Sequence, residues 1–294
     1  PMRLGVDTGG TFTDFVLLDD LGQLRVHKVL STPSAPERAI LAGIREMGLD
    51  PLEITLVHGS TVATNAVLEG KGVKTLYVTN RGFADVLTIG RQQRAELYNL
   101  QPDAVALPVS RGLCVETGGR LSADGRVLEP LTAADLDDLA AAVRRERPEA
   151  VAINLLFSYL DGTAERRLAE VLPDAVFVSL SSRVLPEVRE YERGMATWLN
   201  AWIGPKVAGY LGRLRAQMVA TPVAVMQSTG DSVSADQAAN HAVRMLLSGP
   251  AGGVVAAAAL GAAHGKRHLV SFDMGGTSTD VCRIDEGRPE VSYG

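Results

Sequence analysis

The chain has 294 residues, which is too long for one small core and suits one large α/β domain or two linked ones. Its 29 basic and 34 acidic residues give a net charge of -5, which does not favour nucleic acid or an anionic membrane as a partner. No apolar stretch reaches the ~20 residues that cross a bilayer. Two distant cysteines, Cys114 and Cys282, lack the spacing of a metal site and favour a reducing cytoplasm.

Short apolar strands alternate with helical stretches, starting directly at the N-terminus without a signal peptide. This alternation predicts an α/β fold with a largely parallel sheet. The predicted strands are 3–6, 15–18, 24–29, 55–57, 75–78, 150–156, 175–179, 223–227, 268–273 and 281–284. The predicted helices are 36–47, 62–68, 164–171, 186–202, 206–214 and 248–263, with Gly204-Pro205 interrupting the longest. Residues 82–130, rich in Gly, Arg and polar residues, are predicted to form an irregular excursion from the sheet.

One motif occurs twice. Asp7 to Asp14 and Asp273 to Asp280 both read Asp-x-Gly-Gly-Thr-x-Thr-Asp after an apolar strand. A single Asp-Gly-Gly or Gly-Gly-Thr turn is ordinary hairpin punctuation, but two extended copies are improbable by accident. We therefore interpret the motif as a pair of phosphate-binding hairpins that grip a nucleoside triphosphate. A Walker-type loop is excluded, since no Gly-Lys-Ser/Thr follows either copy.

The residue types in the motif fit that chemistry. Paired glycines let the backbone approach a phosphate, and successive N–H groups form a nest for anionic oxygens. The predicted nucleotide contacts are Thr8, Gly9, Gly10, Thr11 and Asp14 in the first copy, and Gly275, Gly276, Thr277, Ser278 and Asp280 in the second. Asp7 and Asp273 end their strands beside the phosphates, where a carboxylate is repelled unless a cation intervenes. They are the predicted catalytic residues and Mg²⁺ ligands.

Between the two copies lies a run of small residues that begins Leu247-Ser-Gly-Pro-Ala-Gly-Gly. Pro250 suits a first helical turn. The run predicts either a hinge helix or an ordinary Ala-rich packed helix.

The order of hairpin, small-residue helix and hairpin resembles the actin, Hsp70 and sugar kinase superfamily. Four further motifs narrow the resemblance to the hydantoinase/oxoprolinase family, the ATP-binding subunit type of N-methylhydantoinase, 5-oxoprolinase and acetone carboxylase. These motifs begin at His58 (His-Gly-Ser-Thr-Val-Ala-Thr-Asn-Ala), Gly82 (Gly-Phe-Ala-Asp-Val-Leu-Thr-Ile-Gly-Arg-Gln), Glu187 (Glu-Val-Arg-Glu-Tyr-Glu-Arg) and Ser248 (Ser-Gly-Pro-Ala-Gly-Gly). The resemblance implies an α/β fold of the ribonuclease H-like, actin-like ATPase kind, together with ATP, Mg²⁺ and a hydantoinase B-type partner subunit.

Family members extend well past this C-terminus, so the resemblance implies a fragment with its second lobe truncated. Residues 1–265 are predicted to form the first actin-like lobe, with the family's N-terminal region ending at about 180 and the hydantoinase A region following it. Residues 266–294 would begin the second lobe with its phosphate hairpin. The sheet begun by residues 266–294 would have an unpaired edge, which predicts a homo-oligomer, either a dimer or a swapped hairpin.

Substrate residues are harder to assign. His58, Thr61 and Asn65 either hold a substrate amide or carboxyl group, or Ser60 or Thr61 simply caps a helix. Arg91 and Arg94 either clamp a carboxylate or are solvated loop charges.

On the helix over 186–202, Tyr191 fits the apolar stripe and is predicted to be core. Glu192 and Arg193 fall off this stripe and are predicted to be exposed, with a functional role as the alternative.

These observations lead to one main hypothesis and two alternatives. The main hypothesis is an ATP-dependent hydrolase of a cyclic amide, of the hydantoin or 5-oxoproline type, which phosphorylates the amide oxygen before ring opening. The alternatives are an ATP-dependent ketone carboxylase subunit and a non-enzymatic nucleotide switch of the actin or Hsp70 kind. The 294-residue chain alone is expected to be inactive.

Overall fold

The computed structural model describes residues 2–91, 109–246, 248–274 and 279–290. The chain divides into two compact units, one of Pro1–Gly70 with Val207–Gly294 and the other of Lys71–Lys206. The second unit is thus inserted in sequence between two parts of the first. The lobe boundary at residue 265 stays a prediction.

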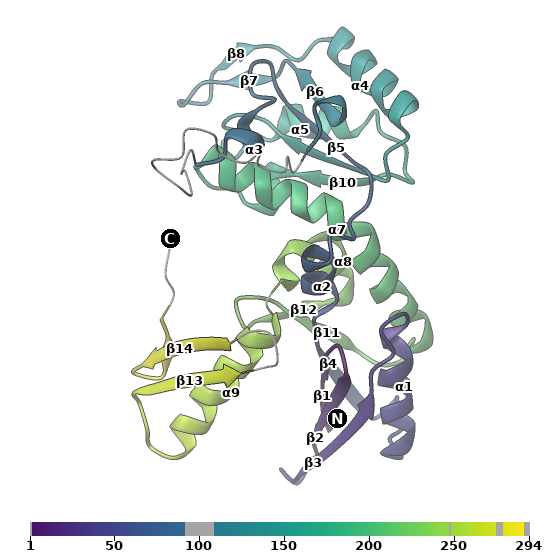
Figure 1. Ribbon diagram of the computed structural model, residues 1–294, viewed down its shortest axis with the longest axis vertical. Helices are drawn as coiled ribbons and strands as arrows, with labels where there is room; N and C mark the ends of the chain where they lie inside the picture. Colours follow the sequence, from purple (N-terminus) through teal and green to yellow (C-terminus); the bar gives the residue numbers. More distant parts are fainter. Residues whose placement is uncertain (1, 92–108, 247, 275–278, 291–294) are drawn as a thin grey trace, which may run out of the picture. The chain divides into compact units, whose positions relative to one another are not determined.

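Among the described residues, the first unit is built on a six-stranded mixed sheet with the order β12-β11-β4-β1-β2-β3 (Figure 1). Strand β2 is antiparallel to β1 and β3, whereas β4 is parallel to β1 and β11 is parallel to β4. This order agrees with the ribonuclease H-like fold that the resemblance implied, but the sheet is mixed and not largely parallel as predicted, because β1, β2 and β3 form consecutive hairpins. Its strands are β1 (Met2–Thr8), β2 (Phe12–Leu18), β3 (Leu24–Leu30), β4 (Ile54–Ser60), β11 (Val223–Met226) and β12 (Ser232–Ser234).

The other elements of this unit follow the predicted order, and the structure adds four short elements that were not predicted: β12, α8, η2 and β15. The hairpin of β13 (Leu269–Met274) and β14 (Thr279–Asp285) is confirmed, and β15 (Arg288–Pro289) pairs with β14. The described helices of this unit are α1 (Pro36–Glu46), α2 (Val62–Leu68), α8 (Ala235–Asn240), the 3₁₀ helix η2 (Ala242–Met245) and α9 (Ser248–Ala263). Helix α8 and η2 were not predicted, because each is only four to six residues long and lacks an amphipathic repeat.

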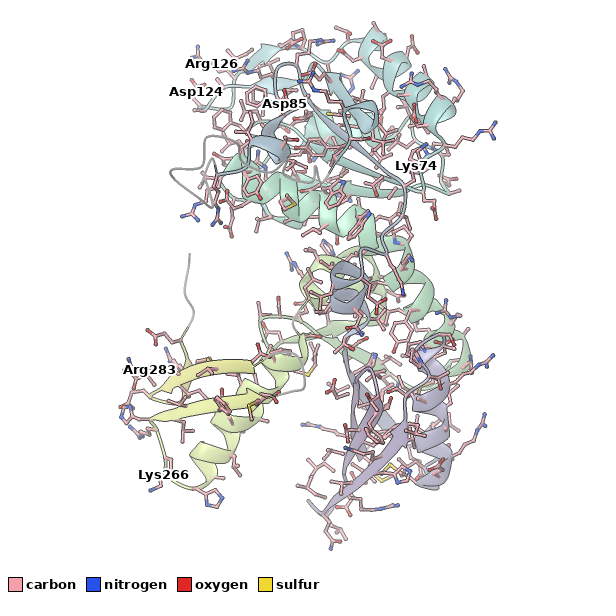
Figure 2. The ribbon with its side chains drawn as sticks, in the orientation of Figure 1. Lys74, Asp85, Asp124, Arg126, Lys266 and Arg283 are labelled. Atoms are coloured by element: carbon pink, nitrogen blue, oxygen red, sulfur yellow. The ribbon has the colours of Figure 1, made fainter. Side chains whose placement is uncertain are left out.

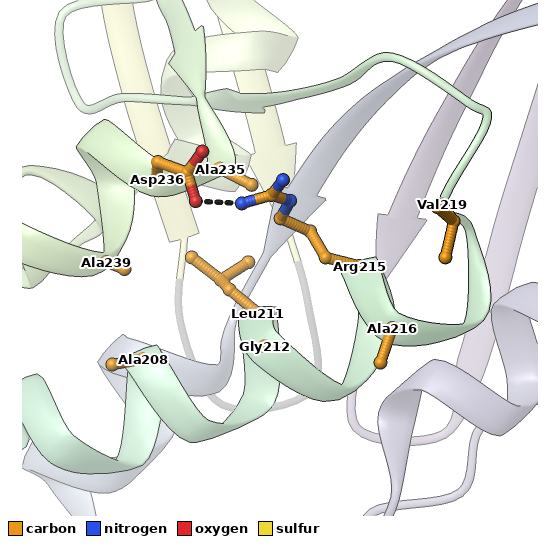
Figure 3. Close-up of a pocket in the computed structure, with 9 residues that line it drawn as sticks. All are labelled: Ala208, Leu211, Gly212, Arg215, Ala216, Val219, Ala235, Asp236 and Ala239. Carbon is orange, nitrogen blue, oxygen red and sulfur yellow. Dashed lines mark hydrogen bonds and ion pairs between the residues drawn. The ribbon is translucent and has the colours of Figure 1, made fainter.

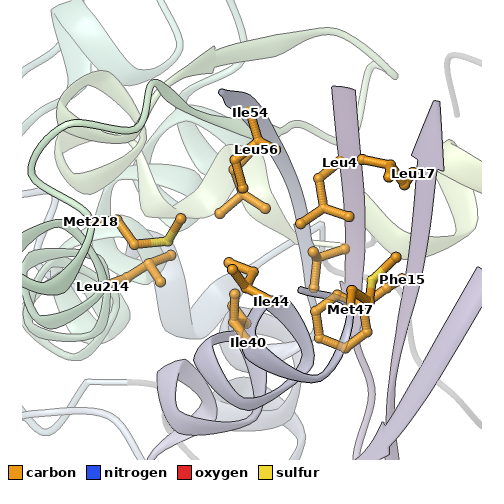
Figure 4. Close-up of a cluster of buried hydrophobic side chains, with 11 residues drawn as sticks. Leu4, Phe15, Leu17, Ile40, Ile44, Met47, Ile54, Leu56, Leu214 and Met218 are labelled. Atoms are coloured by element: carbon orange, nitrogen blue, oxygen red, sulfur yellow. The ribbon is translucent and has the colours of Figure 1, made fainter. Parts of the chain in front are cut away.

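The core of the first unit lies between its six-stranded sheet and two helices, α1 and the C-terminal part of α7 (Glu190–Gln217) (Figure 4). Strands β1 and β2 alternate buried and open residues, so one face of each carries the apolar side chains. Helix α1 begins with Pro36, has Glu37 in its first turn and Arg45 in its last, and so agrees with the helix macrodipole. The buried cluster comprises Leu4, Val6, Phe15, Leu17, Ile40, Ile44, Met47, Ile54, Leu56, Leu214 and Met218.

Helix α7 (Glu190–Gln217) runs without a break through Pro205, contrary to the predicted interruption. A proline inside a helix costs about 3 kcal/mol or more. The side chains that follow it, including Val207, Tyr210 and Leu214, are almost completely buried. Their packing outweighs that cost and keeps the helix continuous.

The second unit contains a four-stranded parallel sheet in the order β10-β9-β5-β6. Its two inner strands are buried at every residue, as expected for a parallel sheet covered on both faces. The strands are β5 (Thr75–Asn80), β6 (Cys114–Thr117), β9 (Ala150–Asn154) and β10 (Phe177–Leu180). The described helices here are α3 (Val86–Ile89), the 3₁₀ helix η1 (Arg111–Leu113), α4 (Ala133–Glu146), α5 (Thr163–Ala169) and α6 (Ser181–Val184), besides the start of α7.

The predicted irregular excursion at 82–130 is partly regular. Strand β6 joins the parallel sheet, and β7 (Arg120–Leu121) pairs with β8 (Val127–Glu129) in a small hairpin. An ion pair of 2.7 Å joins Asp124 and Arg126 in the turn of that hairpin (Figure 2). These strands have only two to four residues, too few to give a readable alternation in the sequence.

Among the described residues, no helix combines the length and the hydropathy that crossing a lipid bilayer requires. The β13–β14 hairpin exposes an apolar face formed by Val270, Phe272, Met274 and Val281. Self-association through this hairpin stays a prediction.

The fit between α1 and the sheet predicts the effect of a helix substitution. An added Cβ at Gly43 would lie 2.1 Å from Cζ of Phe15, so Gly43→Ala must displace the buried ring. We expect it to lower the free energy of unfolding by about 1–3 kcal/mol, measured by urea denaturation followed by circular dichroism. Gly212→Ala in α7 is the matched control, because its Cβ would meet nothing within 4 Å. Helix propensity alone should make the control neutral or stabilising by up to about 1 kcal/mol. Equal effects of the two substitutions would contradict the packing.

Candidate functional site

Three parallel strands of the first unit end at the same edge of the sheet. In the β1–β4 ladder Thr8 pairs with Ser60, and Val225 of β11 pairs with His58, two residues before that end. In open α/β sheets, ligands bind beyond the carboxyl ends of parallel strands. The shared end of these strands therefore directs attention to the turn that follows Thr8.

The two motif copies have the same strand pairing. Asp7 pairs with Asp14 across β1 and β2, and Asp273 pairs with Asp280 across β13 and β14. Each hairpin thus sets the first carboxylate of its motif directly opposite the last. The predicted contacts Gly275, Gly276, Thr277 and Ser278 lie outside the described residues.

The first glycine turn is closed by a hydrogen bond of 3.0 Å from the Gly9 N–H to the Phe12 carbonyl. A Cβ on Gly9 would lie only 3.1 Å from that carbonyl oxygen, whereas a Cβ on Gly10 would meet nothing within 4 Å. Gly9 is therefore required by the tight turn itself, and Gly10 leaves open space beside an exposed backbone. Thr11 is also exposed, while Thr8 is buried.

The carboxylates around this turn repel one another. The pKa of Asp7 is raised above its usual range by partial desolvation, then by the charges of Asp14 and Asp273. Asp14 has a cationic partner, Lys28, at 3.0 Å, whereas no ion pair is seen for Asp7 within the described part of the chain. A divalent cation beside Asp7 would relieve this repulsion, so the residues fit Mg²⁺.

Ready-made metal cages are not found among the described residues, since no three His, Cys, Asp or Glu side chains are grouped to hold an ion. This agrees with the usual mode of Mg²⁺ binding, in which one or two carboxylates act together with phosphate and water.

His58 is in the core and does not face the solvent. Its side chain is fully buried, and its Nε2 atom lies 2.5 Å from the Tyr210 hydroxyl. Burial lowers the pKa of His58 to about 4 and raises that of Tyr210, so both groups are neutral at pH 7 and share one hydrogen bond. This buried position corrects the expectation that His58 contacts substrate directly. The side chain of His58 instead supports the end of β4 from within the core.

Thr61 and Asn65 are closer to the strand ends. The Thr61 hydroxyl donates to the Thr8 carbonyl at 2.9 Å, and the amide of the exposed Asn65 donates to the Thr61 hydroxyl at 3.3 Å. Thr61 is the N-cap of α2 but makes no side-chain capping hydrogen bond, and the Ser60 hydroxyl accepts from the Val62 N–H at 3.2 Å in a turn two residues long. Thr61 therefore ties the start of α2 to the end of β1, and the side chain of Asn65 is exposed.

Arg91 belongs to the second unit, where its Nε atom pairs with Glu192 at 2.8 Å. Arg94 lies outside the described residues. Arg193, predicted to be exposed, is completely buried, which corrects that expectation. Its guanidinium donates to the carbonyls of Glu187 and Leu155, so its role is to hold the start of α7.

Two polar residues that the sequence did not single out support the glycine turn, namely Thr13 and Ser31. Thr13 is fully buried within the motif, and Ser31 follows β3. A third, Ser248 at the start of α9, donates to the Ser60 carbonyl at 3.3 Å and so brings this helix to the strand ends. The repeat of Thr13 at the same motif position was a signal for it, but nothing marked Ser31.

A groove also lies between α7 and α8 (Figure 3). It is lined largely by alanine and glycine and contains one ion pair, between Arg215 and Asp236. None of the motif residues lines it, so we do not treat it as the functional site.

The strand order and the hairpin at the strand ends are those of the actin-like ATPase fold. Comparison with models of protein families matches residues 3–176 to the hydantoinase/oxoprolinase N-terminal region and residues 193–294 to hydantoinase/oxoprolinase. The chain therefore belongs to the hydantoinase/oxoprolinase family, as its motifs predicted.

Similar proteins with a known activity are enzymes. Caprolactamase subunit alpha of Pseudomonas jessenii is 33% identical over 99% of this chain and 44% of the relative, and 5-oxoprolinase 1 of Arabidopsis thaliana is 30% identical over 99% of this chain and 26% of the relative. The solved structure of the ATP-dependent caprolactamase from Pseudomonas jessenii has a TM-score of 0.83 at 33% identity, covering 96% of this chain and 43% of that one. The nucleotide-free structure of acetone carboxylase has a TM-score of 0.83 at 27% identity, covering 98% and 45%. The chain spans less than half the length of these relatives.

The charge repulsion at Asp7 predicts an unusual stability effect. Because its pKa is raised in the folded protein, ionising Asp7 costs stability, and this cost grows as the pH rises from the ordinary Asp value through the raised one. We expect Asp7→Asn to raise the melting temperature at pH 7 and to change it less at pH 4.

Asp135→Asn is the control with the opposite sign. The pKa of Asp135 is lowered, because hydrogen bonds from Thr132 and Arg81 outweigh its desolvation. This substitution should lower the melting temperature at pH 7. The account of Asp7 would fail if both substitutions destabilised the protein alike.

Proposed function

We propose that the chain is the nucleotide-binding part of an ATP-dependent hydrolase that acts on a cyclic amide. The observation that carries this proposal is the β1–β2 hairpin, where an exposed glycine turn adjoins Asp7, a carboxylate held near two others. An anion-binding turn beside Asp7, which forms no ion pair within the described residues, suits a phosphate chain that arrives with its own cation.

The residues of the hairpin have distinct proposed roles. The N–H groups of Gly9 to Thr11 and of the matching turn in the second hairpin bind phosphate oxygens, together with Thr8, Asp14 and Asp280 at the flanks. Asp7 and Asp273 hold the cation. Mg²⁺, when bound, supplies the positive charge that lets carboxylates and phosphates share one site.

The proposed reaction has three steps. The carbonyl oxygen of the amide attacks the γ-phosphorus, the bond to the β-phosphate oxygen breaks, and ADP leaves. In the second step, water adds to the carbon of the phosphorylated amide, and the C–N bond breaks with a proton passing to the leaving nitrogen, which opens the ring and leaves an acyl phosphate. A second water molecule hydrolyses this acyl phosphate to a carboxylate and free phosphate. In the first step the work of the protein is mainly positioning and charge stabilisation. Asn65 and Arg91, both with exposed side chains, are the described candidates for substrate contacts, with Arg94 as a further one.

Relatives also favour a second candidate, because the chain is similar to acetone carboxylase in structure. An ATP-dependent ketone carboxylase would use the same hairpins to activate a different carbonyl compound. The similar proteins with a named activity are enzymes, which disfavours a nucleotide switch without substrate turnover.

A partner subunit is part of the proposal. The relatives include a caprolactamase subunit alpha and an acetone carboxylase beta subunit, whose names place them in multi-subunit enzymes. We propose a hydantoinase B-type partner and self-association, and we expect the 294-residue chain alone to bind nucleotide without turnover.

Nucleotide binding tests the proposal on this chain. In calorimetric titration with Mg·ATP we expect saturable binding that Asp7→Ala abolishes or weakens at least about tenfold, because the cation loses its protein ligand. Asp137→Ala, at an exposed position of α4 in the second unit, is the control and should bind as the unmodified chain does. Absence of binding by the unmodified chain would contradict the proposal.

Substrate dependence separates the candidate activities. In the assembled enzyme with its partner subunit, we expect ATP hydrolysis to rise when a cyclic amide such as 5-oxoproline or a hydantoin is added without bicarbonate. A requirement for bicarbonate and a ketone would favour the carboxylase instead. ATP turnover that ignores every small substrate would favour the switch.

A further inference from the structure

Ser31 contacts the glycine turn at three points. Its backbone N–H donates to the Thr11 carbonyl at 2.9 Å. Its hydroxyl donates to the Gly9 carbonyl at 2.7 Å and lies 2.9 Å from the Thr13 hydroxyl. One serine from the end of β3 therefore reaches every second residue from 9 to 13.

The contact with Gly9 fixes the direction of the next amide. A trans peptide group is planar, and its C=O and N–H point in opposite directions. Since the Gly9 carbonyl points to the Ser31 hydroxyl, the N–H of the same peptide group, which belongs to Gly10, points away from Ser31. Gly10 is exposed, and the space beside its Cα is open.

The turn needs such a support. Two successive glycines have more accessible backbone conformations than any other pair, so the sequence alone leaves the Gly9–Gly10 peptide free to rotate. The hydrogen bond between Gly9 and Phe12 closes the turn and uses the Gly9 N–H but not its carbonyl. Thr13, fully buried, holds the Ser31 hydroxyl from the other side.

We propose that Ser31 is a positioning residue that turns the Gly10 N–H toward the phosphate chain, with Thr13 orienting the Ser31 hydroxyl. This inference rests on the proposed nucleotide-binding function. Ser31 does not touch the nucleotide itself: it pre-organises the donor that does, so that no rotation of the peptide has to occur upon binding.

Four variants test this role, each titrated calorimetrically with Mg·ATP. Ser31→Ala removes the hydroxyl and should weaken binding about tenfold. Ser31→Thr keeps it and should restore most of the affinity. Thr13→Val should weaken binding less than Ser31→Ala, and the two changes together should be less than additive because they break one chain of hydrogen bonds. Ser34→Ala, at an exposed serine of the same loop, is the control and should have no effect.

The amide resonance of Gly10 in NMR spectra gives a second readout, because its shift on addition of nucleotide reports directly on the Gly10 N–H. In the unmodified chain we expect a large shift of this resonance on addition of Mg·ATP. In Ser31→Ala the resonance should already differ without nucleotide and should shift less on binding.

The outcomes separate two failures. If the unmodified chain does not bind Mg·ATP, the proposed function fails, and this inference fails with it. If the unmodified chain binds and Ser31→Ala binds equally well, or if Ser31→Thr fails to restore the affinity, only the positioning role is overturned.

Discussion

The site depends on the way β1 pairs with both of its neighbours. Its antiparallel pairing with β2 places Asp7 opposite Asp14, and its parallel pairing with β4 places Asp7 beside Gly59. A Cβ on Gly59 would lie 3.3 Å from a carboxylate oxygen of Asp7, so glycine at that point leaves room for the carboxylate. Register thus determines where the charge lies and how much space surrounds it.

Buried polar contacts support this arrangement from the opposite face of the sheet. His58 in β4 forms a hydrogen bond with Tyr210 of α7. Arg213, also in α7, forms an ion pair of 2.9 Å with the buried Glu37 of α1. Unsatisfied groups in such places are costly, so each pair restricts how the sheet and α7 can pack.

Much of this unit could be predicted from the sequence because its signals are local. An apolar strand, a Gly-Gly-Thr turn and a second strand lie within about a dozen residues, and the repeat of that pattern identified both hairpins. The fold class and the family follow from the resemblance that the same motifs carry. The residues assigned to phosphate and cation binding have not been tested by the comparisons and stay a proposal.

The features that the sequence could not supply depend on distant partners. Tyr210 lies 152 positions from His58, so nothing near His58 showed that its ring is buried and hydrogen-bonded through Nε2. Arg193 is off the apolar stripe of its helix, yet carbonyl groups from other segments draw its guanidinium into the interior. Pro205 is a helix breaker by its local chemistry, and only the packing of the residues after it explains the continuous helix.

The most direct measurement is a crystal structure of this chain with Mg²⁺ and a non-hydrolysable ATP analogue. The account predicts phosphate oxygens within hydrogen-bonding distance of the Gly10 N–H and Mg²⁺ between those oxygens and the Asp7 carboxylate. A nucleotide bound elsewhere, with the glycine turn and Asp7 free of both phosphate and metal, would contradict it.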